Sequence, residues 1–327
     1  MNLSKKSDYK IAFLDLYAGI KSTENLIDAH VRNTIELAKY INSDLAITEK
    51  QFDKILNNKY DVIIFNYGSG YMPFKKLQYF TNNNPDAQYF YILNEYNLQP
   101  SGTIMKQKNL ELITNFEIEL YKTKKEIKTN VLNLNLLLSK PSNEISKKKY
   151  DCIYYGTFRP NRAKYFQKYL QPEIFLSTSD KNMKKYKHLG CNPKYIKKLS
   201  WHNGKETLNN FKYSLYIEDD FTHFSYNHLA NRYYEAGFCN NVVFFDSNCI
   251  NTIERSELNY FIDQVKYYIV DDYKSLLKKI NECNNDWGKH LAIQKSWRLH
   301  EPIMKKNVID QIYNIVHSKK VVENTIV

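Results

Sequence analysis

Short apolar runs alternate with amphipathic stretches along the whole chain. Runs rich in Ile, Val, Phe and Tyr are typical of buried strands, whereas apolar residues that recur every three or four positions are typical of helices. The runs predict strands at 10–16, 61–66, 87–93, 110–114, 130–138, 150–155, 174–176, 213–217, 242–246, 260–262 and 267–270. The recurring positions predict helices at 24–41, 163–170, 205–210, 226–239, 272–283 and 287–317. Because the two kinds of element alternate, the pattern predicts an α/β protein.

One polar connection divides this pattern into two halves. Residues 139–149 carry Pro141 and a run of lysines, and no other connection in the chain is as typical of a linker. A chain of 327 residues is long enough for two domains with separate cores. We therefore predict domains at 1–142 and 143–299, followed by a C-terminal helical segment, 300–327.

The stretch at the start of the second half is the strongest candidate for a ligand site. The predicted strand 150–155 leads into Gly156, a polar turn with Arg159 and Arg162, and the predicted helix 163–170. Open α/β sheets bind phosphorylated ligands at such turns, where free backbone N–H groups converge on the ligand. Two arginines can neutralise a diphosphate through forked, charge-assisted hydrogen bonds. An ordinary strand–helix turn with two solvated arginines would have the same spacing.

Polar residues that follow other predicted strands give weaker signals. The first strand, 10–16, is not followed by Gly-x-Gly-x-x-Gly, so the sequence does not support a dinucleotide fold. The loop 67–74 has two glycines beside aromatic and thioether side chains and is either a connection or an apolar wedge. Glu95, just beyond the third strand, is either a general base or a solvated glutamate. The acids 218–220 could suggest a metal site, but without matching ligands nearby we favour capping and solvation.

The charge of the chain adds a possible class of partner. The net charge is +12, and residues 181–198 contain seven lysines and no acid. Such a segment suits a polyanion such as nucleic acid. The lysines could equally reflect an AT-rich genome, which enriches Lys, Asn, Ile, Tyr and Phe in any protein that it encodes.

Composition also predicts the cellular setting. The chain is 43% hydrophobic and 15% aromatic, as in globular proteins. Its five cysteines form no C-x-x-C pair, which predicts free thiols in a reducing cytoplasm. The polar start 1–10 predicts no signal peptide, and no apolar run approaches the roughly 18 residues of a membrane span.

Several segments resemble the DNA β-glucosyltransferases of T-even bacteriophages, which are GT-B glycosyltransferases that use UDP-glucose. The resemblance is carried by Asp151–Arg162 and Arg232–Asp246, and more weakly by 267–280, 60–66 and 89–95. It implies a GT-B fold, with two Rossmann-like domains facing a central cleft. It also implies that 143–299 binds the UDP-sugar, while 1–142, joined by the C-terminal helix from about 300 to 327, binds the acceptor DNA.

The resemblance implies specific roles for residues of the second half. Arg159 and Arg162 would hold the UDP diphosphate beside Gly156 and Thr157 and stabilise the leaving group. Glu235 would accept hydrogen bonds from the ribose hydroxyls, with Arg232 supporting the same region. Trp201 falls where the uracil is read.

The resemblance also implies roles for residues of the first half. Glu95 falls on the catalytic carboxylate that takes the proton from the acceptor hydroxymethyl group. Gly70, Tyr71, Met72 and Lys75 match the loop that contacts DNA and fills the gap left by the flipped nucleotide.

The resulting prediction is an inverting, UDP-sugar-dependent glycosyltransferase of viral origin that modifies a 5-hydroxymethylated pyrimidine in double-stranded DNA with base flipping. The prediction includes a monomer without a protein-bound metal, with Mg²⁺ or Mn²⁺ as a non-essential activator. Two alternatives remain: the same donor site with a saccharide, lipid or protein acceptor, or a non-catalytic protein that binds DNA or nucleotide sugar.

Overall fold

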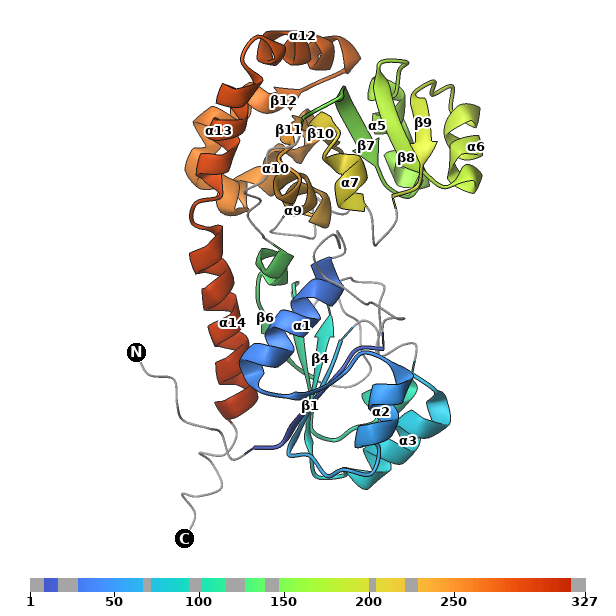
Figure 1. Ribbon diagram of the computed structural model, residues 1–327, viewed down its shortest axis with the longest axis vertical. Helices are drawn as coiled ribbons and strands as arrows, with labels where there is room; N and C mark the ends of the chain where they lie inside the picture. The colour runs from blue at the N-terminus through green and yellow to red at the C-terminus, as the bar shows by residue number, and fades with distance from the viewer. Residues whose placement is uncertain are drawn as a thin grey trace. The chain divides into compact units, whose positions relative to one another are not determined.

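The structure is a computed structural model that describes residues 9–16, 29–66, 72–93, 101–115, 127–138, 147–199, 204–220 and 229–318. The chain divides into two compact units. The first contains His30–Leu137 with β1 and the residues from Ile303 onward, and the second contains Leu138–Pro302. Each is built around one parallel sheet of six strands (Figure 1).

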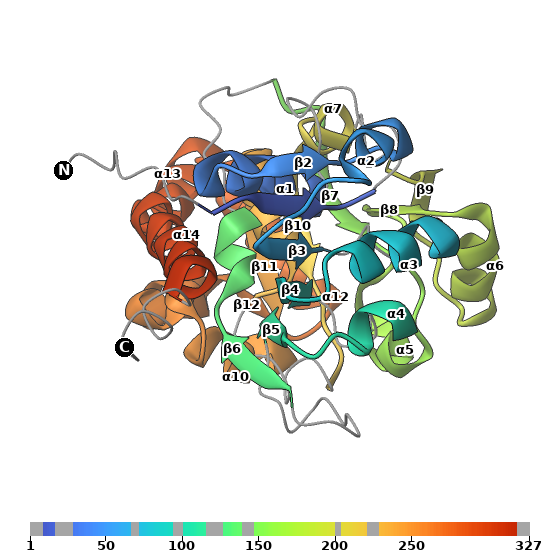
Figure 2. The ribbon, with the colours of Figure 1, turned by 90° about the horizontal axis from the view of Figure 1, so that it is seen from below.

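The first unit is a doubly wound sheet. Its strands are, in sheet order, β2 (Asp44–Ala46), β1 (Ile11–Leu14), β3 (Val62–Phe65), β4 (Gln88–Leu93), β5 (Leu110–Thr114) and β6 (Lys128–Val131). Its helices are α1 (Ala29–Ile41), α2 (Glu49–Ile55), α3 (Phe74–Asn83), α4 (Gly102–Met105) and most of α14 (Glu301–His317). Helices α3 and α4 cover one face and α14 the other (Figure 2). Strands β1, β3 and β5 are buried throughout, as expected for parallel strands covered on both faces.

The second unit repeats this plan. Its strands are, in sheet order, β12 (Ile269–Val270), β11 (Val242–Asp246), β10 (Phe211–Tyr216), β7 (Tyr150–Tyr155), β8 (Ile174–Thr178) and β9 (Lys194–Lys197). Its helices are α5 (Ala163–Tyr169), α6 (Asp180–His188), α7 (Gly204–Leu208), α9 (Asn231–Phe238), α10 (Ile250–Glu254), α11 (Ile262–Val265), α12 (Tyr273–Asn284) and α13 (Trp287–Trp297).

Four predictions about elements were wrong in part. The strand expected at 130–138 ends at Val131 and gives way to a 3-10 helix, Leu134–Leu138, where Asn115 accepts a hydrogen bond from the Leu134 backbone at 2.6 Å. At 260–262 the chain is helical because the hydroxyl of Ser256 accepts from the Leu258 backbone and starts a 3-10 turn. The predicted strand 267–270 is a strand only from Ile269. The single helix expected at 287–317 is two helices, α13 and α14.

Candidate functional site

The candidate site of the second unit lies where its strand order reverses. From β7 the chain proceeds to β8 on one side, and from β10 it proceeds to β11 on the other side. The carboxyl ends of β7 and β10 therefore flank the topological switch point, where open α/β sheets bind their ligands.

The loop that leaves β7 depends on Gly156. This residue has φ +152°, a conformation that side chains rarely adopt, and an added Cβ would lie 3.1 Å from Nη1 of Arg232. The Gly156 amide donates to the Ser177 carbonyl at 3.2 Å, and the hydroxyl of Thr178 donates to the Gly156 carbonyl at 3.0 Å. Both partners belong to β8. The loop is thus fixed in a conformation that glycine adopts easily. A larger residue would be strained there and would also crowd the Arg232 guanidinium.

Beyond the glycine, the loop presents Thr157 and Arg159 to solvent. Both residues are exposed, and the guanidinium of Arg159 forms no ion pair with any described residue. Pro160 begins a 3-10 turn, Pro160–Arg162, that leads directly into α5. With respect to the described residues, Arg159 is therefore an unpaired cation at the switch point and is available to an anionic ligand.

Arg162 has a different environment from Arg159. It is buried, donates from Nε to Asp219 at 3.0 Å, and forms a second ion pair with Glu218. Burial opposes its charge most strongly, but Glu218 together with Tyr154 and Asp219 more than compensates, so the pKa of Arg162 is raised above its usual value. The side chain thus belongs to the frame of the site rather than to its exposed surface.

Arg232, on α9, shares the same carboxylate. Its guanidinium forms an ion pair with Glu218 and donates to the Ile217 carbonyl at 3.2 Å. Again burial is the largest effect and opposes the charge, but Glu218 and the neighbouring tyrosines together outweigh it, so the pKa of Arg232 is raised. Its side chain remains 16% exposed, against 5% for that of Arg162. Arg232 is consequently the more accessible of the two paired arginines.

The preferred interpretation of residues 218–220 as caps and solvated acids was wrong for the first two. Glu218 and Asp219 are 1% exposed and serve as counter-ions for Arg162 and Arg232. Asp220 is exposed, and Lys164 binds it at 2.8 Å. The sequence did contain a signal, because these acids follow the strand β10, just as Arg159 and Arg162 follow the strand β7. Only the strand order shows that the two ends are neighbours.

Glu235 lies one helical turn after Arg232 on α9. It is half-buried and close to Tyr155, the last residue of β7, whose hydroxyl donates to the Arg232 carbonyl at 3.2 Å. Burial first, and then the Glu235 carboxylate, raise the pKa of Tyr155 well above its usual range. The structure thus brings Gly156, Arg232 and Glu235 together around the end of β7.

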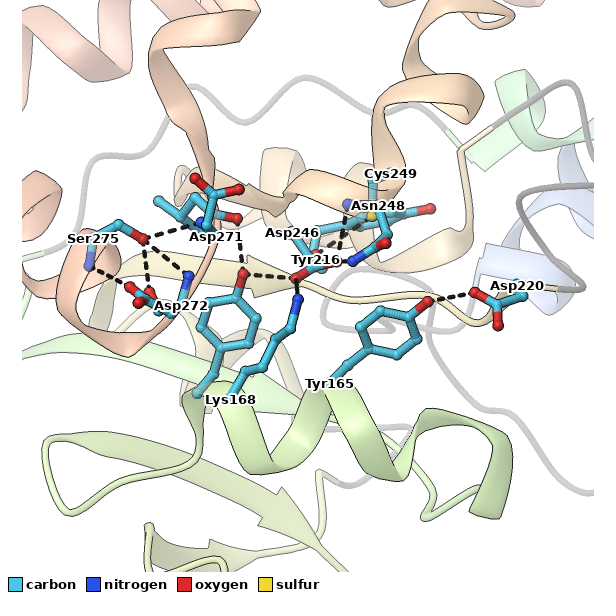
Figure 3. A network of polar contacts seen from close by, with 12 residues as sticks. Tyr165, Lys168, Tyr216, Asp220, Asp246, Asn248, Cys249, Asp271, Asp272 and Ser275 are labelled. Atoms are coloured by element: carbon cyan, nitrogen blue, oxygen red, sulfur yellow. Dashed lines mark hydrogen bonds and ion pairs between the residues drawn. The ribbon is translucent and has the colours of Figure 1, made fainter.

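Helix α5 holds the far end of the loop in place. The hydroxyl of Tyr169 lies 2.6 Å from Oδ2 of Asp246 and 2.8 Å from the Val270 carbonyl, at the ends of β11 and β12. Tyr165 bonds to Asp220 beyond β10, and Lys168 lies 3.9 Å from Asp246 (Figure 3). These contacts tie the helix to three strand ends, so the loop between β7 and α5 is anchored at both sides.

Two of the other predicted site residues are described, both in the first unit. Met72 is buried, at 7% exposure, and Lys75 is exposed on α3. Glu95, Gly70, Tyr71 and Trp201 lie outside the described residues.

The first unit has a switch point of its own that the sequence argument did not use. It lies between β1 and β3, from which the chain proceeds in opposite directions. Asp15 and Asn66 follow these strands and are both buried, at 2% and 4% exposure. The sequence signal for this second switch point was a polar residue directly after each of two apolar runs.

The described residues contain no group of three His, Cys, Asp or Glu side chains arranged to hold a metal ion. Nor does any described helix combine the length and apolarity that crossing a membrane requires. All five cysteines are buried and form no disulfide.

No protein-family model and no curated protein matches the sequence. Solved structures do resemble it. T4 phage β-glucosyltransferase, in a structure of its substrate binding, aligns with a TM-score of 0.68 at 17% identity over 94% of this chain and 99% of that one. The same enzyme with UDP and Mn²⁺ aligns with a TM-score of 0.64 at 17% identity, over 92% and 99%. An α-glucosyltransferase in complex with UDP and a 13-mer DNA containing an HMU base aligns with a TM-score of 0.51 at 11% identity, over 93% and 95%. With its two parallel six-stranded sheets, the chain therefore has the predicted GT-B fold.

Proposed function

We propose that this protein is a glycosyltransferase that moves glucose from UDP-glucose to a 5-hydroxymethylated pyrimidine in double-stranded DNA. The similar structures include complexes with UDP-glucose, with UDP and Mn²⁺, and with DNA that carries an HMU base. Fold alone does not determine chemistry, so the proposal depends on the residues at the switch point.

A single observation carries the donor half of the proposal: an exposed Arg159, without an ion pair to any described residue, follows a glycine turn at the switch point of the second sheet. Its guanidinium can bind the diphosphate with charge-assisted hydrogen bonds and stabilise the charge that develops as UDP leaves. The exposed Thr157 adds a hydroxyl donor beside it. Arg162 and Arg232, fixed by Glu218 and Asp219, form a rigid frame behind this loop, with Arg232 nearer to solvent.

Glu235 would bind the ribose of the donor. Its half-buried carboxylate lies on α9, one turn from Arg232, so the two side chains share one face of the helix. A carboxylate accepts hydrogen bonds from two vicinal hydroxyls, as a ribose offers. We propose the uracil contact at Trp201 on the resemblance alone.

For the acceptor, we propose that Glu95 takes the proton from the hydroxymethyl group while its oxygen attacks the anomeric carbon. One direct displacement, with UDP as leaving group, inverts that centre. The first unit, residues 1–142 with the C-terminal helix, would bind the DNA, with Tyr71 filling the gap left by the flipped base. A divalent cation, as a non-essential activator, would enter with the diphosphate.

The decisive experiment combines a binding and a turnover measurement. Arg159→Ala should weaken UDP binding by about 2 kcal/mol, or roughly thirtyfold, because it removes a charge-assisted contact without disturbing a buried group. Arg255→Ala, at the end of α10 in the same unit, is the control and should leave UDP affinity unchanged. Calorimetric titration with UDP measures both.

Turnover tests the acceptor. The unsubstituted protein should release UDP from UDP-glucose when duplex DNA with hydroxymethylated bases is added. If UDP is released only with a saccharide, lipid or protein acceptor, that acceptor takes the place of DNA in the proposal. Tight, Arg159-dependent UDP binding without turnover on any acceptor would leave a non-catalytic nucleotide-binding protein.

A further inference from the structure

Seven exposed lysines gather at one end of the second unit. They lie on α6, on the edge strand β9 and just after it, and in both ribbon views α6 lies next to β9 (Figures 1 and 2). We call these residues the lysine surface: Lys181, Lys184, Lys185, Lys187, Lys194, Lys197 and Lys198. They equal more than half of the net charge of +12, and no acid occurs between 181 and 198.

The lysine surface is not neutralised by the protein itself. None of its seven ammonium groups forms an ion pair with an acid in the described part of the chain. Two other exposed lysines of this unit do have acidic partners: Lys164 binds Asp220 at 2.8 Å, and Lys266 lies 3.7 Å from Asp263. The positive field of this surface is therefore open to a ligand.

Protection of the sheet edge explains only part of this surface. Lysines on an edge strand discourage pairing with another chain, which accounts for Lys194 and Lys197 on β9. On α6, however, Lys181, Lys184 and Lys185 have the three- and four-residue spacing of one helix face. Like charges at that spacing destabilise a helix by about 0.2–0.5 kcal/mol per pair. A bound polyanion would reverse this cost.

The lysine surface continues into the proposed donor loop. Nζ of Lys185 lies 5.4 Å from the ring centre of Phe158, which packs against Tyr186 of α6 at 5.2 Å. Phe158 immediately precedes Arg159. A polyanion along α6 would therefore pass beside the loop that we assign to the diphosphate.

We propose that the lysine surface binds the phosphate backbone of the acceptor DNA, flanking the base that receives the sugar. This inference rests on the proposed function. Duplex DNA carries about one negative charge per 1.7 Å of helix axis, and lysines on flexible stems bind it without reading sequence. A membrane surface fits less well, because none of the large apolar side chains that are exposed among the described residues belongs to 181–198.

The test compares two triple variants of the full chain. Lys181→Gln, Lys184→Gln and Lys197→Gln together remove three charges without touching Phe158. The control replaces Lys274, Lys278 and Lys289 by Gln, which removes three equally exposed charges from α12 and α13. Binding to an unmodified 24-base-pair duplex is measured by fluorescence anisotropy at several salt concentrations.

The surface variant should bind the duplex at least about tenfold more weakly at low salt, and the slope of log Kd against log salt should fall by about 2 to 3. Its UDP affinity should be unchanged, while its KM for hydroxymethylated duplex rises. Equal effects of the two triple variants on duplex binding would overturn the inference, as would lysine-dependent binding that is tighter to anionic vesicles than to DNA. Failure of the proposed function itself would give a different result: the unsubstituted protein would release no UDP with any hydroxymethylated DNA.

Discussion

Glu218 is the residue on which both paired arginines depend. It follows β10, while Arg162 precedes α5 and Arg232 lies on α9, so one carboxylate joins three elements. With Asp219, the four groups balance their charges inside the unit. A buried pair of this kind is costly to break, because the remaining charge has neither water nor a partner.

We predict that Glu218→Gln destabilises the protein by about 3–5 kcal/mol, because Arg162 then keeps Asp219 alone of its two acids and Arg232 loses the acid with which it is paired. UDP affinity should also fall, since Arg232 loses its fixed position. Urea unfolding and UDP titration measure the two effects. Glu254→Gln, an exposed glutamate on α10, is the matched control and should change unfolding by less than about 0.5 kcal/mol. Equal stability of the two variants would show that Glu218 does not hold the arginines.

At the scale of elements, the start of α14 contains a second buried group of charges. Glu301 is 7% exposed, and Nε of Arg298 lies 3.9 Å from its carboxylate. Arg298 packs over the ring of Tyr233 at 4.8 Å. Burial, partly offset by Arg298 and reinforced by the carboxylate of Glu257, raises the pKa of Glu301 from 4.5 to about 7.

This shift predicts a pH dependence of stability. Well below pH 4.5, Glu301 is protonated in both the folded and the unfolded chain, so it does not change how the free energy of unfolding depends on pH. As the pH rises toward 7 only the unfolded chain ionises it, so the free energy of unfolding falls by on the order of 3 kcal/mol until the folded group also ionises. Glu301→Gln should remove this decline. Urea unfolding from pH 4.5 to 8 measures the difference, and parallel pH profiles of the variant and the unsubstituted protein would contradict the assigned shift.

At the scale of the whole molecule, the C-terminal helix joins the chain's end to its first unit. Val308, Ile312 and Val316 are all buried and recur every four residues. Lys305 binds Glu36 of α1 at 2.7 Å, and the Tyr313 ring lies 5.9 Å from that of Tyr40. Most of α14 is thus a structural part of the first unit, although it follows the second in sequence.

We predict that Ile312→Ala destabilises the first unit by about 2–5 kcal/mol, through lost burial and the cavity left behind. UDP binding, which we assign to the second unit, should be unaffected. The control is Ile303→Ala on the same helix, where the side chain is 62% exposed and its loss should cost little. Thermal unfolding and UDP titration separate the two effects. A loss of UDP affinity in Ile312→Ala equal to its loss of stability would argue against independent units.

The sequence by itself determined the class of fold and the position of the glycine turn after β7. Strand β11 is buried throughout and β7 is buried from Cys152 onward, so both are mainly apolar runs, and their bounds were predicted correctly. Gly156 and its two arginines were visible because a strand–glycine–helix turn is a local pattern. Only the tertiary structure decided how the two arginines differ. Arg162 finds its partner Glu218 at a separation of 56 residues, through a strand order that no local pattern encodes, while Arg159 meets no acid among the described residues and remains free.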